Sequence, residues 1–231
     1  MRLEVVGVTG LPEIARGDDL AGLIAHAAQL ADGDVVVVTQ KIVSKAEGAM
    51  VTVDPDDPLS HKAVVERESV RVLRRRGELI ISETKHGFVC ANAGVDRSNV
   101  AADQAALLPD DPDRSARRIR DGIRAQTGIA VGVIVSDTFG RPWRRGVADV
   151  AIGVAGVRPL LDLRGTPDAA GRELQVTEMA IADELAAAAE LVMGKAEGVP
   201  VAVIRGVPSE WLGPGSIRAD MIRPPTEDLF R

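Results

Sequence analysis

Val131-Gly-Val-Ile-Val-Ser136 is an apolar, β-branched run of the kind that forms a strand packed on both faces. It continues as Asp137-Thr-Phe-Gly-Arg-Pro-Trp-Arg-Arg-Gly146, where Gly140 and Pro142 interrupt the strand and three arginines follow. An acid and a hydroxyl therefore stand at the strand end, where α/β proteins usually bind ligands. The stretch predicts a site for a hard cation and phosphate. The alternative is a strand end followed by a solvated charge cluster.

On both sides of this stretch, helical and strand patterns alternate along the chain. Apolar residues recur at helical spacing in four segments, and each segment precedes a short apolar run. The expected pairs are helix 17–31 with strand 35–39, helix 60–76 with strand 79–83, helix 113–128 with strand 131–136, and a helix from about Glu173 through Ile181–Met193 with strand 199–204. This alternation predicts a mixed α/β (α+β) protein and leaves the strand order open. Loops are expected at 39–49, 84–100, 138–146 and 164–172, where chemistry is most common.

The composition excludes several functional classes. The net charge of -6 and the isoelectric point of about 5.2 give no global attraction to nucleic acid or to anionic membranes. No apolar run approaches the roughly 20 residues of a membrane span, and the start lacks a signal peptide, so a cytoplasmic protein is expected. A single cysteine and three scattered histidines argue against a disulfide and against a zinc site.

Familiar nucleotide motifs are missing, but two further loops carry polar groups. The P-loop pattern and the full dinucleotide glycine triplet do not occur. Lys41–Gly48 offers lysines and a serine that suit phosphate oxygens, although a plain exposed loop explains them equally. In Lys85–Asn99, Asp96 is a candidate metal ligand, with an Asx-type turn as the alternative. Cys90 is expected to be buried and unreactive, not a nucleophile.

Five ordered motifs between about Val5 and Gly206 resemble the coenzyme F420:L-glutamate ligase family. They are Gly10–Ile14, Lys41-Ile-Val-Ser-Lys-Ala-Glu-Gly48, His86-Gly-Phe-Val-Cys-Ala-Asn-Ala-Gly-Val-Asp-Arg-Ser-Asn99, Ser136-Asp-Thr-Phe-Gly-Arg-Pro-Trp-Arg-Arg-Gly146 and Met193-Gly-Lys-Ala-Glu-Gly198. The resemblance implies the F420 gamma-glutamyl ligase-like mixed α/β fold for residues 1–206 and an intertwined homodimer. It implies a GTP-dependent, GDP-forming ligase that joins coenzyme F420-0 to L-glutamate through an acyl phosphate and then extends a γ-linked polyglutamate tail.

The same resemblance assigns cofactors, partners and site residues. Magnesium or manganese, together with potassium, would act as cofactors, and the partners would be GTP, L-glutamate and F420-0 or its dehydro precursor. The expected ligands of the divalent metal are Asp96 and Asp137, and Thr138 is expected to bind a second cation. Some relatives carry an acid near the position of Lys195, and Glu197 is expected to replace it as a metal ligand. The expected GTP contacts are Leu11, Pro12, Glu13, Ile14, Gln40, Lys45, Asn99, Met193, Gly194, Lys195, Ala196, Glu197, Gly198 and Val199.

Three catalytic candidates and the final segment complete the expectations. Arg141, Arg144 and Arg145 are hypothesised to steady the transferring phosphoryl group. Residues 207–231 are rich in proline and glycine and are expected to form a tail, a wrapping arm or a linker. Because Ile222–Phe230 resembles a junction in actinobacterial relatives, a nitroreductase-like domain would follow in the linker case. Two rival functions stay open, namely a metal-dependent phosphohydrolase and a non-catalytic nucleotide- or deazaflavin-binding module.

Overall fold

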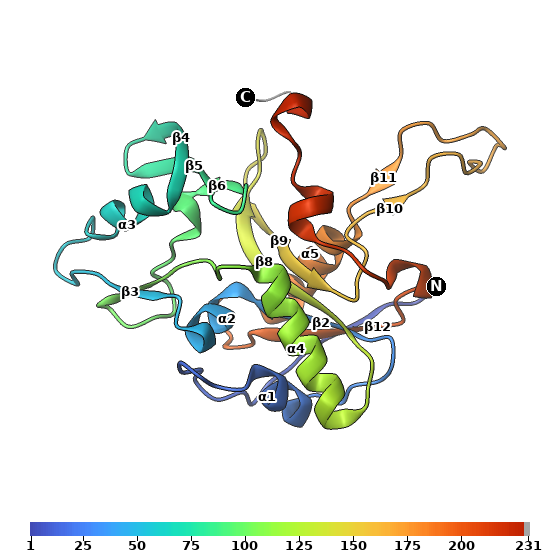
Figure 1. The fold of residues 1–231 in the computed structure, drawn as a ribbon, viewed down its shortest axis with the longest axis horizontal. Coiled ribbons are helices and arrows are strands. Elements are labelled where there is room, and N and C mark those ends of the chain that lie inside the picture. Colours follow the sequence, from blue (N-terminus) through green and yellow to red (C-terminus); the bar gives the residue numbers. More distant parts are fainter. Residues whose placement is uncertain (229–231) are drawn as a thin grey trace.

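A five-stranded sheet forms the centre of the computed structural model, which describes residues 1–228 (Figure 1). Its strands follow the order β1 (Glu4–Gly7), β12 (Val201–Arg205), β2 (Val35–Thr39), β8 (Gly132–Gly140) and β9 (Val147–Ala155). Only β2 and β8 run parallel, and the other neighbours are antiparallel. Val35–Val38 are fully buried, as expected for a β-branched strand covered on both faces.

Helices cover both faces of this sheet. In Figure 1, α4 (Pro112–Thr127) lies in front of β8 and β9, while α5 (Ile181–Met193) lies behind the sheet. The amphipathic helix α4 begins at Asp111, whose carboxylate accepts a hydrogen bond from the Arg114 N–H at 2.9 Å, and it ends at Gly128 in a left-handed conformation. The short helix α1 (Leu20–Ala27) packs against α4, and α2 (Gln40–Glu47) contacts β2 and β8.

The edge strand β9 has its outward N–H groups bound by helix carboxylates. The carboxylates belong to α4 and α5. The N–H groups of Asp149, Ala151 and Val154 donate to Glu190, Asp183 and Asp113, respectively, at 2.8–2.9 Å. An exposed edge would otherwise be a template for pairing with another chain. The same contacts bring acidic side chains of α5 beside the start of β9.

Residues 50–107 form a smaller unit with a separate apolar core. It contains the two-stranded sheet β3 (Met50–Thr52) and β7 (Gln104–Ala106), helix α3 (His61–Glu68), and the three-stranded sheet β4 (Ser69–Arg76), β5 (Leu79–Thr84) and β6 (Val89–Ala91). A 3-10 turn at Asn92–Gly94 follows β6. Val64, Val65, Ile80, Val95 and Ala105 are among the residues of this core.

The predicted helix 60–76 is wrong in its second half. Helix α3 ends at Glu68, and residues 69–76 form strand β4, which makes an antiparallel hairpin with β5 around Gly77. The segment Ser-Val-Arg-Val-Leu-Arg-Arg-Arg mixes β-branched and cationic residues, and cross-strand pairing with β5 outweighs its helical propensity. Gly77 adopts a positive φ of 58°, which suits the turn.

Other boundaries also differ from the expectations. The predicted loop 39–49 contains α2, and strand β9 was not predicted. The predicted strand 131–136 is too short, because β8 continues through Asp137 and Thr138 to Gly140, where the loop was expected, and pairs there with β9. Helix α1 is shorter than the expected 17–31, and α5 begins only at Ile181 because Glu178–Met179 forms strand β11, which pairs with β10 (Leu161–Asp162). Strands β2, β5, β8 and β12 lie where strands were expected, within two residues at their starts.

The described part of the final segment packs against the body. It contains short helical turns at Ser209–Trp211, Ile217–Met221 and Pro225–Glu227. Ile217 is buried, and the Ser216 hydroxyl and Ile217 N–H donate to Asp113 at 2.7 and 3.1 Å. Phe230 of the predicted junction lies outside the described residues, so the linker remains a prediction. Within residues 1–228, every helix is too short or too polar to cross a membrane.

Candidate active site

A cavity of about 810 Å³ opens at one edge of the central sheet. Strands β1, β2 and β8 point in one direction and end at this edge, while β12 and β9 run the opposite way and begin there. Loops and strand ends from residues 11–14, 39–45, 96–99, 136–149 and 193–200 therefore line one cavity. The carboxyl ends of parallel strands are a usual place for a ligand site.

This cavity brings together most of the site residues expected from the sequence. Sixteen of the predicted positions line it. They are Leu11, Pro12, Glu13, Ile14, Gln40, Lys45, Asp96, Asn99, Asp137, Thr138, Met193, Gly194, Lys195, Ala196, Gly198 and Val199. The four that do not line it are Glu197, Arg141, Arg144 and Arg145. The roles given to these residues are predictions, and what the structure adds is their position.

Asp137 carries an unusual carboxyl group on β8. Burial raises its pKa to about 7, and the nearby carboxylates of Asp96 and Asp149 act in the same direction. One acidic neighbour, Asp96, lies on the distant 96–99 loop, and the other, Asp149, lies on the adjacent strand β9. A carboxyl that is costly to ionise next to other acids is a favourable ligand for a cation, because the cation removes that cost.

Asp96 forms the turn that the sequence offered as one alternative, and its predicted role as a metal ligand stays a prediction. It forms an Asx turn, since its carboxylate accepts bonds from the Ser98 N–H and hydroxyl at 2.7 and 2.9 Å, and it also lines the cavity. Lys41 forms an ion pair with it at 2.7 Å. Burial raises the pKa of Asp96, but the bonds from Lys41 and Ser98 outweigh this and lower it, so this carboxylate stays ionised.

A second polar group lies around Asp149 at the start of β9. Ser136 and Thr138 of β8 donate hydroxyl hydrogen bonds to its two carboxylate oxygens at 3.0 and 2.6 Å. Lys195 approaches from the 193–200 loop, with its ammonium nitrogen 2.9 Å from Asp149 and 2.5 Å from Glu190 of α5. Because Asp137 lies between Ser136 and Thr138, strand alternation directs it to the other face.

The predicted nucleotide contacts are held by neighbouring side chains. Lys45 at the end of α2 forms an ion pair with Glu13, which ties the 11–14 loop to this helix. Gln40 is buried, and its side-chain nitrogen donates to the Ser44 hydroxyl and the Leu107 carbonyl at 2.6 and 2.7 Å. Lys45 thus lies beside the cavity as a cation, whereas the Gln40 nitrogen holds α2 against the 50–107 unit.

Glu197 does not turn toward the predicted metal ligands. Its carboxylate accepts the Ala196 N–H at 2.9 Å, and bonds from the backbone of its own loop lower its pKa. It also folds over Gly194, where an added Cβ would stand 1.9 Å from a Glu197 oxygen. With φ of 61° and ψ of -166°, Gly194 adopts a conformation that is essentially restricted to glycine.

The three arginines lie at the tip of the β8–β9 hairpin and are exposed. Arg141 donates to the Arg145 carbonyl at 2.8 Å, which braces the turn. Trp143 at the same tip is 82% exposed and has a positive φ of 57°. The hairpin extends from strands that line the cavity, so the arginines lie beyond its wall.

Sequence reasoning missed several polar residues of this site. Lys41 and Ser98 fell inside quoted segments without being chosen, and Asp149 and Glu190 were not considered. Asp149 is only 3% exposed and interrupts the apolar run Val147-Ala-Asp-Val-Ala-Ile. A lone acid in a strand of this kind costs free energy unless it is paired, and this was the available signal.

The residues present fit a divalent cation better than a zinc site. Asp96 and Asp137 offer carboxylate oxygens, which magnesium and manganese prefer, whereas the Thr138 hydroxyl is bonded to Asp149 and Lys195. Among residues 1–228, no three His, Cys, Asp or Glu side chains are close enough to form a preassembled metal cluster. Burial raises the pKa of Cys90 to about 12, so this thiol is inert at neutral pH, as expected.

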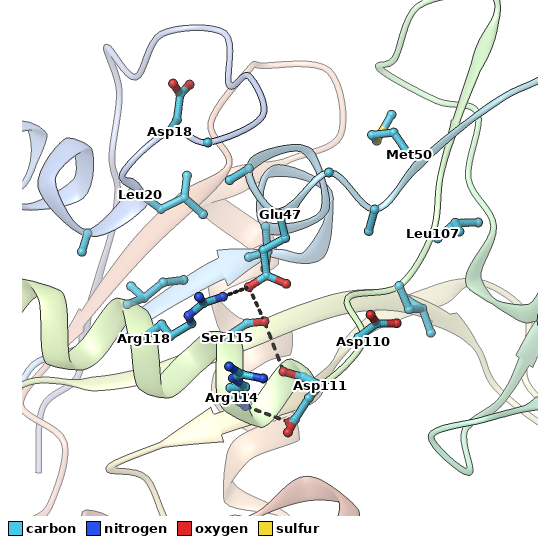
Figure 2. A pocket seen from close by; sticks show the side chains of 18 of the residues that line it. Asp18, Leu20, Glu47, Met50, Leu107, Asp110, Asp111, Arg114, Ser115 and Arg118 are labelled. Atoms are coloured by element: carbon cyan, nitrogen blue, oxygen red, sulfur yellow. Dashed lines mark hydrogen bonds and ion pairs between the residues drawn. The ribbon is translucent and has the colours of Figure 1, made fainter.

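A different cavity of about 840 Å³ lies between α1, α2 and α4 (Figure 2). Several of its charged groups have partners within the cavity lining. Glu47 accepts a bond from the Ser115 hydroxyl at 2.8 Å and lies 3.8 Å from Arg118, while Asp111 caps α4. Lys85 forms an ion pair with Asp110. These contacts are those of structural residues, so the cavity at the sheet edge is the stronger candidate.

The fold and the cavity define a mixed α/β protein whose acidic, lysine-lined site lies at the end of a parallel strand pair. The profile of the F420-0:Gamma-glutamyl ligase family matches residues 9–206. The chain therefore belongs to this family.

Curated relatives agree with this assignment over their whole length. The coenzyme F420:L-glutamate ligase of Methanothermobacter thermautotrophicus is 44% identical over 256 residues, with both chains fully covered. The protein of the same name from Methanopyrus kandleri is 46% identical, covering 95% of this chain and 94% of its own. That of Methanocaldococcus jannaschii is 44% identical, covering 100% and 97%.

Proposed function

We propose that this protein joins coenzyme F420-0 to L-glutamate in an amide bond, at the expense of GTP, and then adds further γ-linked glutamates. The proposal draws the reaction from the names of the curated relatives and from the family resemblance. The observation that carries the proposal is that five separate segments bring four acidic residues and three lysines to one cavity. Such a lining suits a nucleotide triphosphate with a divalent cation.

The first half of the reaction activates a carboxylate. An oxygen of the F420-0 carboxylate attacks the γ-phosphorus of GTP, the bond to the β-phosphate oxygen breaks, and GDP leaves an acyl phosphate behind. Lys45 and Lys41 lie where they would offset phosphate charge, and Asp96 and Asp137 would hold magnesium or manganese. The cation would supply charge stabilisation at the phosphate oxygens. The hairpin arginines remain candidates for steadying the transferred phosphoryl group.

The second half forms the amide. The neutral amine of glutamate attacks the acyl carbon, inorganic phosphate leaves, and the amine proton passes to solvent or to a nearby base. No covalent enzyme nucleophile is needed, which agrees with the inert Cys90.

Mass spectrometry tests this function directly. F420-0 incubated with the protein, GTP, Mn²⁺ and L-glutamate should gain the mass of one or more glutamyl units. Release of GDP without glutamate would instead favour the phosphohydrolase, and tight nucleotide binding without turnover would favour the binding module. Omitting Mn²⁺, and separately omitting glutamate, provides the matched controls.

The proposed homodimer has a candidate surface in the 50–107 unit. Val70, Val72, Leu79 and Val89 of the three-stranded sheet are 37–68% exposed. Exposed apolar residues gathered on one sheet are typical of protein interfaces. Sedimentation analysis should give twice the chain mass of 24.4 kDa, and Val70→Lys should shift the protein toward the monomer.

A further inference from the structure

Lys195 places an ammonium group where a metal ion would be expected. Its nitrogen lies 2.7 Å from the Thr138 hydroxyl, 2.9 Å from Asp149 and 2.5 Å from Glu190. The three oxygens come from β8, β9 and α5, so three separate elements supply them. Three converging oxygens, two of them carboxylate, resemble the coordination of a cation more than an ordinary surface ion pair.

The surroundings show that these oxygens need a positive charge. Asp149 is 3% exposed and the Glu190 side chain is 19% exposed, so neither carboxylate is well hydrated. The second Glu190 oxygen accepts the Asp149 N–H at 2.9 Å, which holds the two acids together. Lys195 supplies this charge, because its ammonium group is bonded to both carboxylates.

The charge balance divides the site into two halves. Lys195 with Asp149 and Glu190 forms one half, and Lys41 with Asp96 and Asp137 forms the other. With every group ionised, each half keeps one negative charge, so the whole site is two charges short of neutral. One divalent cation would supply this charge. Among residues 1–228, Lys41 is paired with Asp96 but no ammonium group is paired with Asp137, so the cation would bind beside these two acids.

We propose that Lys195 is a built-in cation, whose ammonium group takes the place of a second metal ion beside Thr138, Asp149 and Glu190. Phosphoryl-transfer sites often use two cations to hold attacking and leaving oxygens. In this chain one would be divalent and exchangeable, while the other is tethered to the Gly194–Gly198 loop. This inference rests on the proposed function for the presence of nucleotide and metal.

Lys195 also connects the Gly194–Gly198 loop to Asp149 and Glu190. Gly194 and Gly198 both have positive φ angles, so the loop backbone can place the lysine without a Cβ clash. The Asn99 side chain donates to the Lys195 carbonyl at 3.4 Å. A loop that lines the nucleotide cavity would therefore be held closed by its own cation, and not by a metal taken from solution.

Counting bound manganese tests the proposal on the unaltered protein. With GDP and saturating Mn²⁺, electron paramagnetic resonance should count one Mn²⁺ per chain. Two Mn²⁺ per chain would overturn this inference while leaving the proposed function intact. No bound Mn²⁺ would overturn both. This measurement does not depend on whether a variant folds.

Variants of Lys195 give a second readout that a structural role would not produce. Lys195→Ala should bind a second Mn²⁺, and its thermal midpoint in metal-free buffer should rise when K⁺ or NH₄⁺ replaces tetramethylammonium. Wild type and the control Lys85→Ala, which removes an exposed ion pair, should show neither change. A Lys195→Ala protein that keeps one Mn²⁺ and ignores the monovalent ion would contradict the proposal. Lys195→Gln, nearly equal in size, repeats the test if alanine unfolds the loop.

Discussion

The two cavities on either side of α2 contain similar residue types but differ in how their charges are satisfied. In the cavity between α1, α2 and α4, Glu47 and Asp111 both have bonding partners on α4 (Figure 2). At the sheet edge, Asp137 is half-buried beside other acids, and loss of solvent raises its pKa to about 7. Both cavities contain acidic residues, so acidity alone does not identify the functional one. The sheet-edge cavity differs because the charge of its acids is incompletely compensated.

The difference arises from where the groups originate. Asp111, Arg114, Ser115 and Arg118 belong to the start of one helix. Asp111 caps this helix, and Glu47 of the facing helix α2 pairs with Ser115 and Arg118. The acids of the sheet-edge cavity come from distant strands and loops, and the fold forces them together. A fold maintains such a costly arrangement when a ligand relieves it.

The largest expected effect comes from Asp137→Asn. Removing the carboxylate that would hold the divalent cation should lower turnover on the order of 100-fold or more. The measurement is Mn²⁺-dependent GDP release in the presence of F420-0 and glutamate. Glu47→Gln serves as the matched control from the other cavity. An unchanged rate in Asp137→Asn would remove this residue from the metal site.

The affinity for the divalent cation should depend on pH. Because the pKa of Asp137 is raised to about 7, protons compete with the metal below that pH. Affinity for Mn²⁺ should fall by up to about tenfold per pH unit as the solution is acidified from pH 7. Calorimetric titration between pH 5.5 and 8 measures this. A flat profile would mean that Asp137 is not a ligand.

The stability of the metal-free protein should fall as pH rises between about 4 and 7. The native state holds the Asp137 proton over this range, whereas the unfolded chain releases it near its ordinary pKa of 3.8. Stability contributed by this group is therefore lost as pH rises, by at most roughly 1.4 kcal/mol per unit. Urea unfolding at several pH values checks the slope, which Asp137→Asn and saturating Mn²⁺ should both flatten.

The smallest effect is expected in the other cavity. Glu47→Gln removes an ion pair with Arg118 but can keep the bond with Ser115, so the free energy of unfolding should change by less than about 1 kcal/mol. Turnover should match wild type. A strong loss of activity with normal stability would show that this cavity also takes part in the reaction.

Local patterns in the sequence settled much of the fold. The apolar runs at 35–39 and 131–136, and the capped helix at 113–128, form where the patterns predicted them. The failures lie where pairing decides the structure. Residues 69–76 became a strand only because β5 was available, and β9 was overlooked because the acid Asp149 interrupts its apolar pattern.

The motifs likewise named most residues of the cavity, because each one keeps its ligand groups within a short segment. What they did not supply was the partner of each group. Lys41 meets Asp96, and Lys195 meets Asp149, across separations of about 50 residues, and these contacts follow from strand direction and order. Side-chain chemistry is thus encoded locally. Which charges remain uncompensated is decided by the tertiary structure, since electrostatic energy depends on distances and burial that only the folded chain defines.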